Sequence, residues 1–221
     1  MNEKYLAELF GAFAGDGWMT QGKSSISLFI TGNPKDEINY YETRIHFLFH
    51  QTFNFDIQPR NFKYWKTYGI YTGKKSIINE FIKHDFPIGE KSSRVKVPKK
   101  ILLNPKLHKS FLRGLFDTDG CIAFRKSYNK NASIWQKKVR HRPAVFITTI
   151  SKLLAEQITV MFEKLQLPFS IRIESPRNGY KTSYRILLEG KANTKKFFNV
   201  IKPMNKKHTD KFETWLSQGF Y

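Results

Sequence analysis

The spacing of apolar residues predicts helices and strands in two similar blocks. Apolar side chains at Leu9 and Phe13, and again at Leu112 and Phe116, lie one helical turn apart and predict two helices that end near Gly17 and Gly120. In the first block, alternating and β-branched runs predict strands over residues 24–32, 57–64 and 68–72, with helices over 35–53 and 74–84. In the second block, the same signals predict strands over 121–127, 144–150, 169–175 and 183–189, with helices over 151–166 and 192–201. We interpret both blocks as repeats of the order helix, strand, strand, helix, strand, strand, helix, although the pattern delimits only one strand before the second helix of the first block.

The first helices of the two blocks are copies of one motif. Aligning residues 6–19 with residues 109–122 pairs Gly11 with Gly114 and Asp16 with Asp119. A carboxylate at a helix C-terminus is disfavoured, because that end of the helix is already negative. The recurrence of an acid at this position in both copies therefore indicates a function for the pair, such as binding a cation.

Small residues lie four apart on one stripe of each motif helix, at Ala7 and Gly11 in the first copy and at Ser110 and Gly114 in the second. A glycine inside a helix costs about 1 kcal/mol relative to alanine, but small residues allow two helix backbones to approach closely. We therefore expect the two helices to pack side by side at these residues. Their acidic C-terminal ends would then meet.

The chain is strongly basic. Its 221 residues include 38 Lys and Arg against 18 Asp and Glu, which gives a formal net charge of +20. Such a surplus indicates a polyanionic partner, because each cation placed on a phosphate releases counterions. Residues 57–79 and 121–155 contain no acidic side chain, so two strand-rich stretches concentrate the positive charge. Nucleic acid is the expected partner.

Composition also limits the class of protein. Cys121 is the only cysteine, which excludes an intrachain disulfide and a zinc cluster built on thiolates. No apolar run approaches the length of a membrane span, and the first residues lack the pattern of a secretory leader. We expect an intracellular protein, in the cytoplasm or an organelle matrix, with no membrane partner.

Two helices that end in GAFAGDG and GLFDTDG, each opening a basic αββαββα block, resemble the LAGLIDADG homing endonucleases, in particular the monomeric members with two motifs. Ala14 stands where the family motif has its first acid, whereas the acid before the final glycine is present in both copies. The resemblance covers essentially the whole chain. We expect an N-terminal half at residues 1–89, a linker rich in Lys, Ser and Pro at 90–105, and a C-terminal half at 106–221.

The resemblance implies an α+β fold in which a duplicated αββαββα half repeats about a pseudo-twofold axis. Two curved antiparallel sheets would bind DNA, joined by the paired LAGLIDADG helices. The implied activity is site-specific cleavage of both strands of a long DNA target, by divalent-metal-dependent phosphodiester hydrolysis, in the homing of an intron or a similar element. The chain lacks the terminal His-Asn pair and the N-terminal nucleophile of an intein, so we expect a free-standing enzyme. Because one chain carries both motifs, the resemblance implies a monomer.

The same resemblance assigns the catalytic and metal-binding roles to Asp16 and Asp119, one for each DNA strand. Mg²⁺ is a hard cation that prefers oxygen ligands, and two or more ions are expected. Mn²⁺ is expected to substitute, and Ca²⁺ to support binding without cleavage. The backbone carbonyls of Gly15 and Thr118 are expected to be free at the helix ends, as further candidate metal ligands.

Two lysines end the halves at matching positions. Lys91 follows Pro87 by four residues, and Lys207 follows Pro203 by four. Both are candidate catalytic cations for the water network or the phosphate charge, with phosphate clamps or ordinary surface lysines as the alternative. Asp117 is expected to bond neighbouring backbone or side chains rather than to take part in the chemistry.

Side chains on strands and their loops are the candidate DNA contacts, because Lys and Arg bind phosphates and guanine edges. They are Lys23, Ser25, Arg60, Lys63, Lys66, Arg125, Lys126, Lys137, Lys138, Arg140, Arg142, Arg172, Arg177, Lys181 and Arg185. Two alternatives use the same fold: a non-catalytic DNA-binding regulator, and an RNA-binding maturase that binds its host intron RNA. Loss of a motif acid would favour the regulator, and both acids are present.

Overall fold

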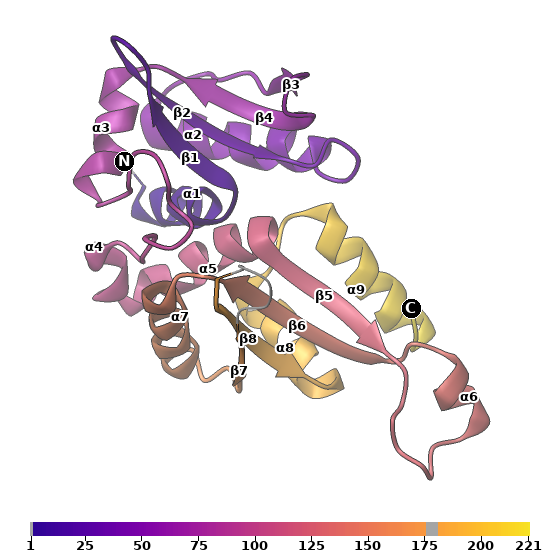
Figure 1. Cartoon of the computed structure of the whole chain (residues 1–221). Coiled ribbons are helices and arrows are strands. Elements are labelled where there is room, and N and C mark those ends of the chain that lie inside the picture. The colour runs from indigo at the N-terminus through magenta and orange to yellow at the C-terminus, as the bar shows by residue number, and fades with distance from the viewer. Residues whose placement is uncertain (1, 176–180) are drawn as a thin grey trace.

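The computed structural model describes residues 2–175 and 181–221 and confirms an α+β fold of two similar halves (Figure 1). In the N-terminal half, α1 (Glu3–Asp16) runs directly into β1 (Gly17–Gln21) and β2 (Ile26–Gly32). The segments η1 (Tyr40–Ile45) and α2 (His46–Phe53) connect these strands to β3 (Arg60–Phe62) and β4 (Thr67–Thr72), and α3 (Lys75–Lys83) follows. The strands form one antiparallel sheet in the order β1-β2-β4-β3.

The C-terminal half repeats this plan after the short helix α4 (Lys99–Leu102). Helix α5 (Pro105–Asp119) runs into β5 (Gly120–Arg125), α6 (Ile134–Lys138) and β6 (Arg142–Thr149). Helix α7 (Lys152–Lys164), strands β7 (Ser170–Glu174) and β8 (Ser183–Glu189), and helices α8 (Lys191–Ile201) and α9 (Lys206–Gln218) complete it. The sheet order is β5-β6-β8-β7, again antiparallel.

The two sheets share one register. Gly17 pairs with Ile30 in the first sheet, and Gly120 pairs with Ile147 in the second. Each residue of one sheet therefore has a definite counterpart in the other, which allows the two halves to be compared position by position.

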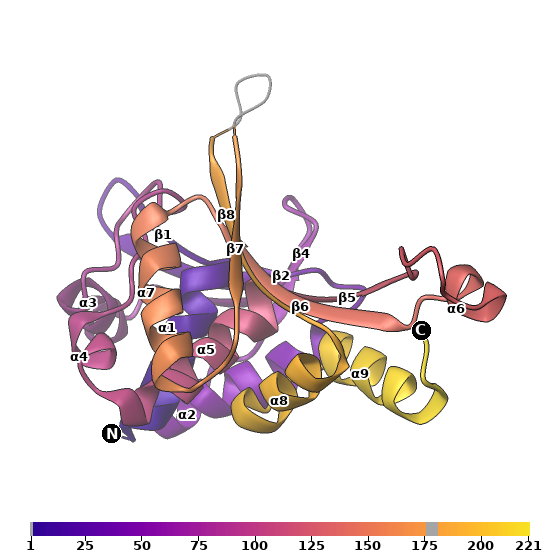
Figure 2. The same cartoon turned by 90° about the horizontal axis from the view of Figure 1, so that it is seen from below.

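The motif helices lie at the centre of the molecule. Figure 1 shows α1 and α5 side by side between the two halves, with one sheet on each side of the pair. Figure 2 shows α2, α8 and α9 on one side of the strands, while the β7–β8 ribbon projects from the opposite side. Inward-facing residues such as Leu28, Ile30, Val145 and Ile186 are fully buried against the helices. One face of each sheet is thus core and the other is free to bind a partner.

Two predicted elements are shorter than the sequence pattern suggested. The helix expected over 35–53 begins with a turn, in which the Asn33 carbonyl accepts from the amides of Asp36 and Glu37, and then a π-helical segment at Tyr40–Ile45. The strand expected over 57–64 is reduced to Arg60–Phe62, because Pro59 has no amide to donate to the ladder.

Three helices, α4, α6 and α9, lie where the sequence pattern predicted none, and α4 falls within the expected linker. Helix α9 is mostly polar, and its apolar residues are limited to Phe212, Trp215 and the exposed Leu216. Phe212 stacks on Phe198 of α8 with ring centroids 3.9 Å apart, which attaches the helix to the C-terminal half. Across the described residues, every helix is too short or too polar to cross a membrane.

Candidate active site

The two motif helices touch at their glycines. A β-carbon placed on Gly11 would lie 2.0 Å from the carbonyl oxygen of Phe111, and one on Gly114 would lie 1.9 Å from that of Glu8. Both distances are far inside van der Waals contact, so only glycine fits at either position. Ala7 and Ser110 are also buried along this stripe, as their spacing predicts.

The contact continues to the helix ends and brings the two motif acids together. A β-carbon on Gly15 would lie 2.1 Å from Thr118 Oγ1 and 3.2 Å from the carboxyl carbon of Asp119. Asp16 is the next residue and is half-buried, while Asp119 is exposed. Asp119 also lines an open hollow with Lys91 and Thr148. The carboxylates therefore share one site between the halves.

The final glycine of each motif has a steric role. A β-carbon on Gly17 would lie 2.2 Å from the Phe13 ring, and one on Gly120 would lie 2.2 Å from the Phe116 ring. Each glycine takes an extended conformation and caps its helix. The chain can then pass from helix to strand immediately after the acid, which fixes the backbone that carries it.

Lys91 and Lys207 bind the ends of the two motif helices. Lys91 Nζ donates to the carbonyl oxygens of Phe13, Ala14 and Gly15 at 2.8, 2.6 and 2.6 Å. Lys207 Nζ donates to the Thr118 carbonyl at 2.7 Å. Cations at these positions offset the negative helix ends beside the acids.

The carbonyls of Gly15 and Thr118 are therefore not free, contrary to the expectation from the sequence. Each has one hydrogen bond from a lysine, because the lysines reach the last helical turn from the ends of the two halves. A carbonyl oxygen retains a second lone pair. Metal ligation by these two carbonyls stays a prediction.

The electrostatics of the site follow from burial of like charges. Burial, followed by the nearby Asp119 and Glu37 carboxylates, raises the pKa of Asp16 to about 7. Partial loss of water also raises the pKa of Asp119, against the attraction of Lys91 and Lys207. Burial lowers the pKa of Lys91 to about 8. A divalent cation between the carboxylates would relieve their repulsion.

Tyr41 and Glu37 belong to the site, although the sequence did not indicate them. The Tyr41 hydroxyl donates to Asp16 Oδ2 at 3.1 Å. Glu37 Oε1 accepts from Lys207 Nζ at 2.6 Å and thereby links the N-terminal half to the end of α5. The π-helical segment that carries Tyr41 is a feature often found at functional sites, but it is visible only in the structure.

Asp117 has the structural role expected for it. Its buried carboxylate accepts from the backbone amides of Met204 and Asn205 at 3.0 and 3.1 Å. Asn205 in turn donates its side-chain amide to the Asp117 carbonyl at 2.8 Å. These bonds hold the segment before α9 and so place Lys207 at the end of α5.

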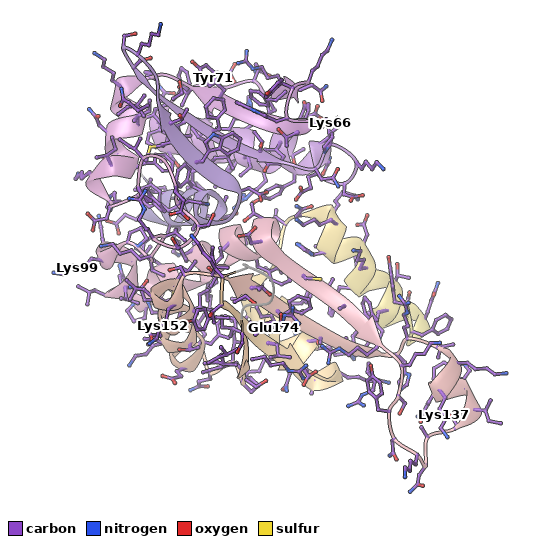
Figure 3. The ribbon with its side chains drawn as sticks, viewed as in Figure 1. Lys66, Tyr71, Lys99, Lys137, Lys152 and Glu174 are labelled. Carbon is purple, nitrogen blue, oxygen red and sulfur yellow. The ribbon has the colours of Figure 1, made fainter. Side chains whose placement is uncertain are left out.

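The candidate DNA contacts lie on the outward faces of the sheets and on projecting loops. Arg177 lies outside the described residues, and all the others are exposed or half-exposed. Figure 3 shows Lys66 at the edge of the N-terminal half and Lys137 on the arm that carries α6. Several arginines of the C-terminal sheet are paired with acids: Glu189 accepts from Arg125 and Arg172, and Glu174 pairs with Arg185.

The residues present fit a divalent cation that is completed by its substrate. Within residues 2–175 and 181–221, no group of three or more His, Cys, Asp or Glu side chains is placed to hold a metal ion. Two adjacent carboxylates are nevertheless the hard oxygen donors that Mg²⁺ uses when phosphate oxygens and waters supply the other ligands. Burial and the neighbouring carboxylates raise the pKa of Asp16 to about 7, and a bound cation would favour its ionised form.

Sequence comparison finds segments of two larger proteins. The chain is 27% identical over 197 residues to a Replication factor C small subunit of Methanocaldococcus jannaschii, covering 89% of the chain and 9% of that protein. It is 26% identical over 155 residues to the Probable translation initiation factor IF-2 of the same organism, covering 66% of the chain and 12% of that protein. The chain thus spans about a tenth of either relative.

Solved structures share the fold across nearly the whole chain. The homing endonuclease I-DmoI in complex with DNA and Mn has a TM-score of 0.61 at 17% identity, covering 90% of this chain and 96% of that one. The LAGLIDADG homing endonuclease I-GzeII in complex with its DNA target has a TM-score of 0.56 at 10% identity, covering 99% and 90%. The model of the family described as LAGLIDADG-like domain matches residues 106–202. Residues 106–202 therefore match the LAGLIDADG-like domain family, and the chain as a whole shares the two-domain fold of these solved homing endonucleases.

Proposed function

We propose that the protein is a site-specific endonuclease that cuts both strands of double-stranded DNA. The observation that carries this proposal is the placement of Asp16 and Asp119 at adjacent helix ends, each with a lysine bound to the carbonyls of its own helix. A duplex has two scissile phosphates related by a twofold axis. A pair of carboxylates on a pseudo-twofold scaffold matches that symmetry.

Phosphodiester hydrolysis needs an attacking water and relief of the charge that develops on phosphate. Bound divalent cations, Mg²⁺ or Mn²⁺ in this proposal, would activate the water and stabilise the departing oxygen. Asp16 and Asp119 would hold these ions. Lys91 and Lys207 would offset the negative charge of the helix ends and thereby favour binding of an anionic substrate. Solved I-DmoI complexes with DNA and Mn, DNA and Ca, and target DNA in the presence of Mg support the use of a divalent metal.

A long duplex target is supported by the charge of +20 and by the two outward sheet faces. The matching segments lie inside two proteins with unrelated names, a replication factor and a translation factor. A module found in unrelated hosts favours the homing of a mobile element over a role in either process. The proposal includes a monomer, since both acids come from one chain, and an intracellular location.

The test uses duplexes recovered from a randomised DNA pool by binding in Ca²⁺. Wild-type protein is then incubated with a recovered duplex in Mg²⁺, in Mn²⁺ and in Ca²⁺, and products are resolved on denaturing gels. The proposal predicts cleavage of both strands in Mg²⁺ and Mn²⁺ and intact DNA in Ca²⁺. Binding without cleavage in any metal would favour a regulator, and preferential binding of structured RNA would favour a maturase.

A further inference from the structure

The outward face of the N-terminal sheet is built from aromatic side chains. Trp18, Phe29 and Tyr71 are direct cross-strand neighbours on β1, β2 and β4. Trp18 stacks on Phe29 with ring centroids 4.9 Å apart, and Tyr71 lies 5.0 Å from Phe29. Phe62 of β3 and Trp65 of the following turn approach Phe29 to 5.9 and 5.2 Å. We term these five residues the aromatic face.

The aromatic face is separate from the core. Side chains alternate along a strand, and the neighbours Met19, Leu28 and Ile30 point to the other side, where each is 0% exposed. Trp65 and Tyr71 are 45% and 38% exposed, and Figure 3 labels Tyr71 in the N-terminal half. Large exposed apolar groups gathered in one place mark an interaction surface.

The equivalent face of the C-terminal sheet has different chemistry. The register places Cys121, Phe146 and Leu187 at the positions of the three cross-strand aromatic residues. Around them the face carries charged groups, and Arg125 and Arg172 lie 2.7 and 3.1 Å from oxygens of the same glutamate, at position 189. The two halves therefore present unlike surfaces to a common partner.

Both faces lie on the side of the carboxylates. Trp18 is two residues beyond Asp16, at the start of β1, and Thr148 on the outward face of β6 lines the same hollow as Asp119. Cations flank the aromatic face: the Arg60 guanidinium lies 5.1 Å from the Tyr71 ring. An apolar centre with cationic flanks suits the floor of a DNA groove between phosphate strands.

We propose that the aromatic face contacts the C5-methyl groups of thymines in the major groove. The half of the target beneath the N-terminal sheet would then be selected for A·T pairs by apolar contact. This inference rests on the proposed binding of duplex DNA. In the major groove only thymine presents a methyl group, and apolar side chains recognise it. A G·C pair placed against these rings offers no methyl group for apolar contact.

The packing of the rings favours a duplex over unpaired bases. Trp18 and Phe29 are stacked on each other at an interplanar angle of 7°, and Trp65 stands on Phe29 at 84°. The central ring is therefore covered by its neighbours and is closed to a stacking base. Ring edges and the outer surfaces of Trp65 and Tyr71 remain, and these can contact methyl groups. Selective binding of single strands would contradict this assignment.

The test is the Ca²⁺ selection described above, run once with thymine and once with uracil in its place. Uracil lacks only the methyl group. Burial of one methyl stabilises a complex by about 0.8 kcal/mol, or about fourfold in affinity for each contact. In the selection with thymine, we expect the recovered duplexes to share A·T pairs on one side of the site centre. In the selection with uracil, we expect this preference to be lost on that side and the other side to be unchanged.

Two variants test whether the N-terminal sheet contacts the side of the target on which A·T pairs are selected. Trp65→Ser removes an exposed ring of the aromatic face and is expected to abolish the preference for thymine over uracil. Tyr128→Ser removes a tyrosine of the C-terminal half that is 78% exposed, and this variant is expected to retain the preference for thymine over uracil. Equal affinity for thymine and uracil duplexes would overturn this inference and leave the endonuclease proposal standing. Failure to recover any duplex would overturn both.

Discussion

The Nζ atom of Lys91 lies 2.6 Å from the carbonyl oxygen of Gly15, the residue directly before Asp16. Lys207 makes the corresponding contact at Thr118, before Asp119. Each motif helix ends on an acid. The negative charge of that helix end is offset, because a lysine donates hydrogen bonds to the last carbonyls of the helix. The paired acids and the paired lysines form one electrostatic unit.

Replacing Lys91 by methionine tests how much its hydrogen bonds to the end of α1 contribute to the free energy of unfolding. Lys91→Met leaves the carbonyls of Phe13, Ala14 and Gly15 without their buried donor, and we expect a loss of about 1–3 kcal/mol in the free energy of unfolding. Urea denaturation measures the loss. Lys96→Met is the control, because the half-exposed Lys96 makes only a surface pair with Asp85 at 3.2 Å. Equal midpoints for the two variants would show that the bonds of Lys91 contribute little.

Gly11→Ala reverses the usual effect of removing a helical glycine. Alanine normally stabilises a helix by about 1 kcal/mol relative to glycine. Here its β-carbon would lie 2.0 Å from the Phe111 carbonyl oxygen, so α1 and α5 must separate and the protein is expected to lose stability. Gly73→Ala is the control, because its β-carbon would meet only the Tyr71 hydroxyl at 3.6 Å. Thermal unfolding of both variants distinguishes them, and a stabilised Gly11→Ala protein would rule out the close contact.

Tyr41→Phe should affect the two DNA strands unequally. The variant removes the hydroxyl that donates to Asp16 at 3.1 Å and leaves Asp119 unchanged. We expect slower cutting of one strand and transient accumulation of a nicked duplex, measured with separate end labels on the strands. Tyr40→Phe is the matched control, because the buried Tyr40 hydroxyl has no hydrogen-bond partner among the described residues. Equal slowing of both strands would assign Tyr41 a general structural role instead.

Burial of His208 is expected to lower the free energy of unfolding in acid. Burial lowers the pKa of His208 to about 3, from an ordinary value of 6.5. Between these values the unfolded chain binds the proton and the folded chain does not, so stability falls as the pH falls below 6.5. The expected loss from this group between pH 7 and pH 5 is about 2 kcal/mol. His208→Leu should flatten this part of the profile, and an unchanged slope in urea titrations at the two pH values would contradict the assignment.

Much of the fold could be predicted because the motif is repeated. The small residues at Gly11 and Gly114 specified the helix contact, and the acids at Asp16 and Asp119 specified the site. The two antiparallel sheets were expected from the resemblance to the LAGLIDADG family, and the structure confirms them. These features depend on local periodicity and on comparison of one half with the other, and both are visible in a single sequence.

The site residues that the sequence did not indicate make contacts with residues far away along the chain. Glu37 comes from the turn after β2 and receives Lys207 from the other half at 2.6 Å. Tyr41 reaches Asp16 only because η1 folds over α1. Such contacts join residues far apart in the chain without any repeat or spacing to reveal them. The aromatic face was also missed, because its residues alternate with core residues on short strands and resemble ordinary apolar sequence.

The most direct test of the paired acids is strand-resolved cleavage by the single variants Asp16→Asn and Asp119→Asn. Each substitution removes one anionic carboxylate and keeps the size of the side chain. With a selected duplex in Mg²⁺, the account predicts that neither variant makes a double-strand break, while both bind the duplex in Ca²⁺ as the wild type does. Undiminished double-strand cleavage by both variants would contradict it.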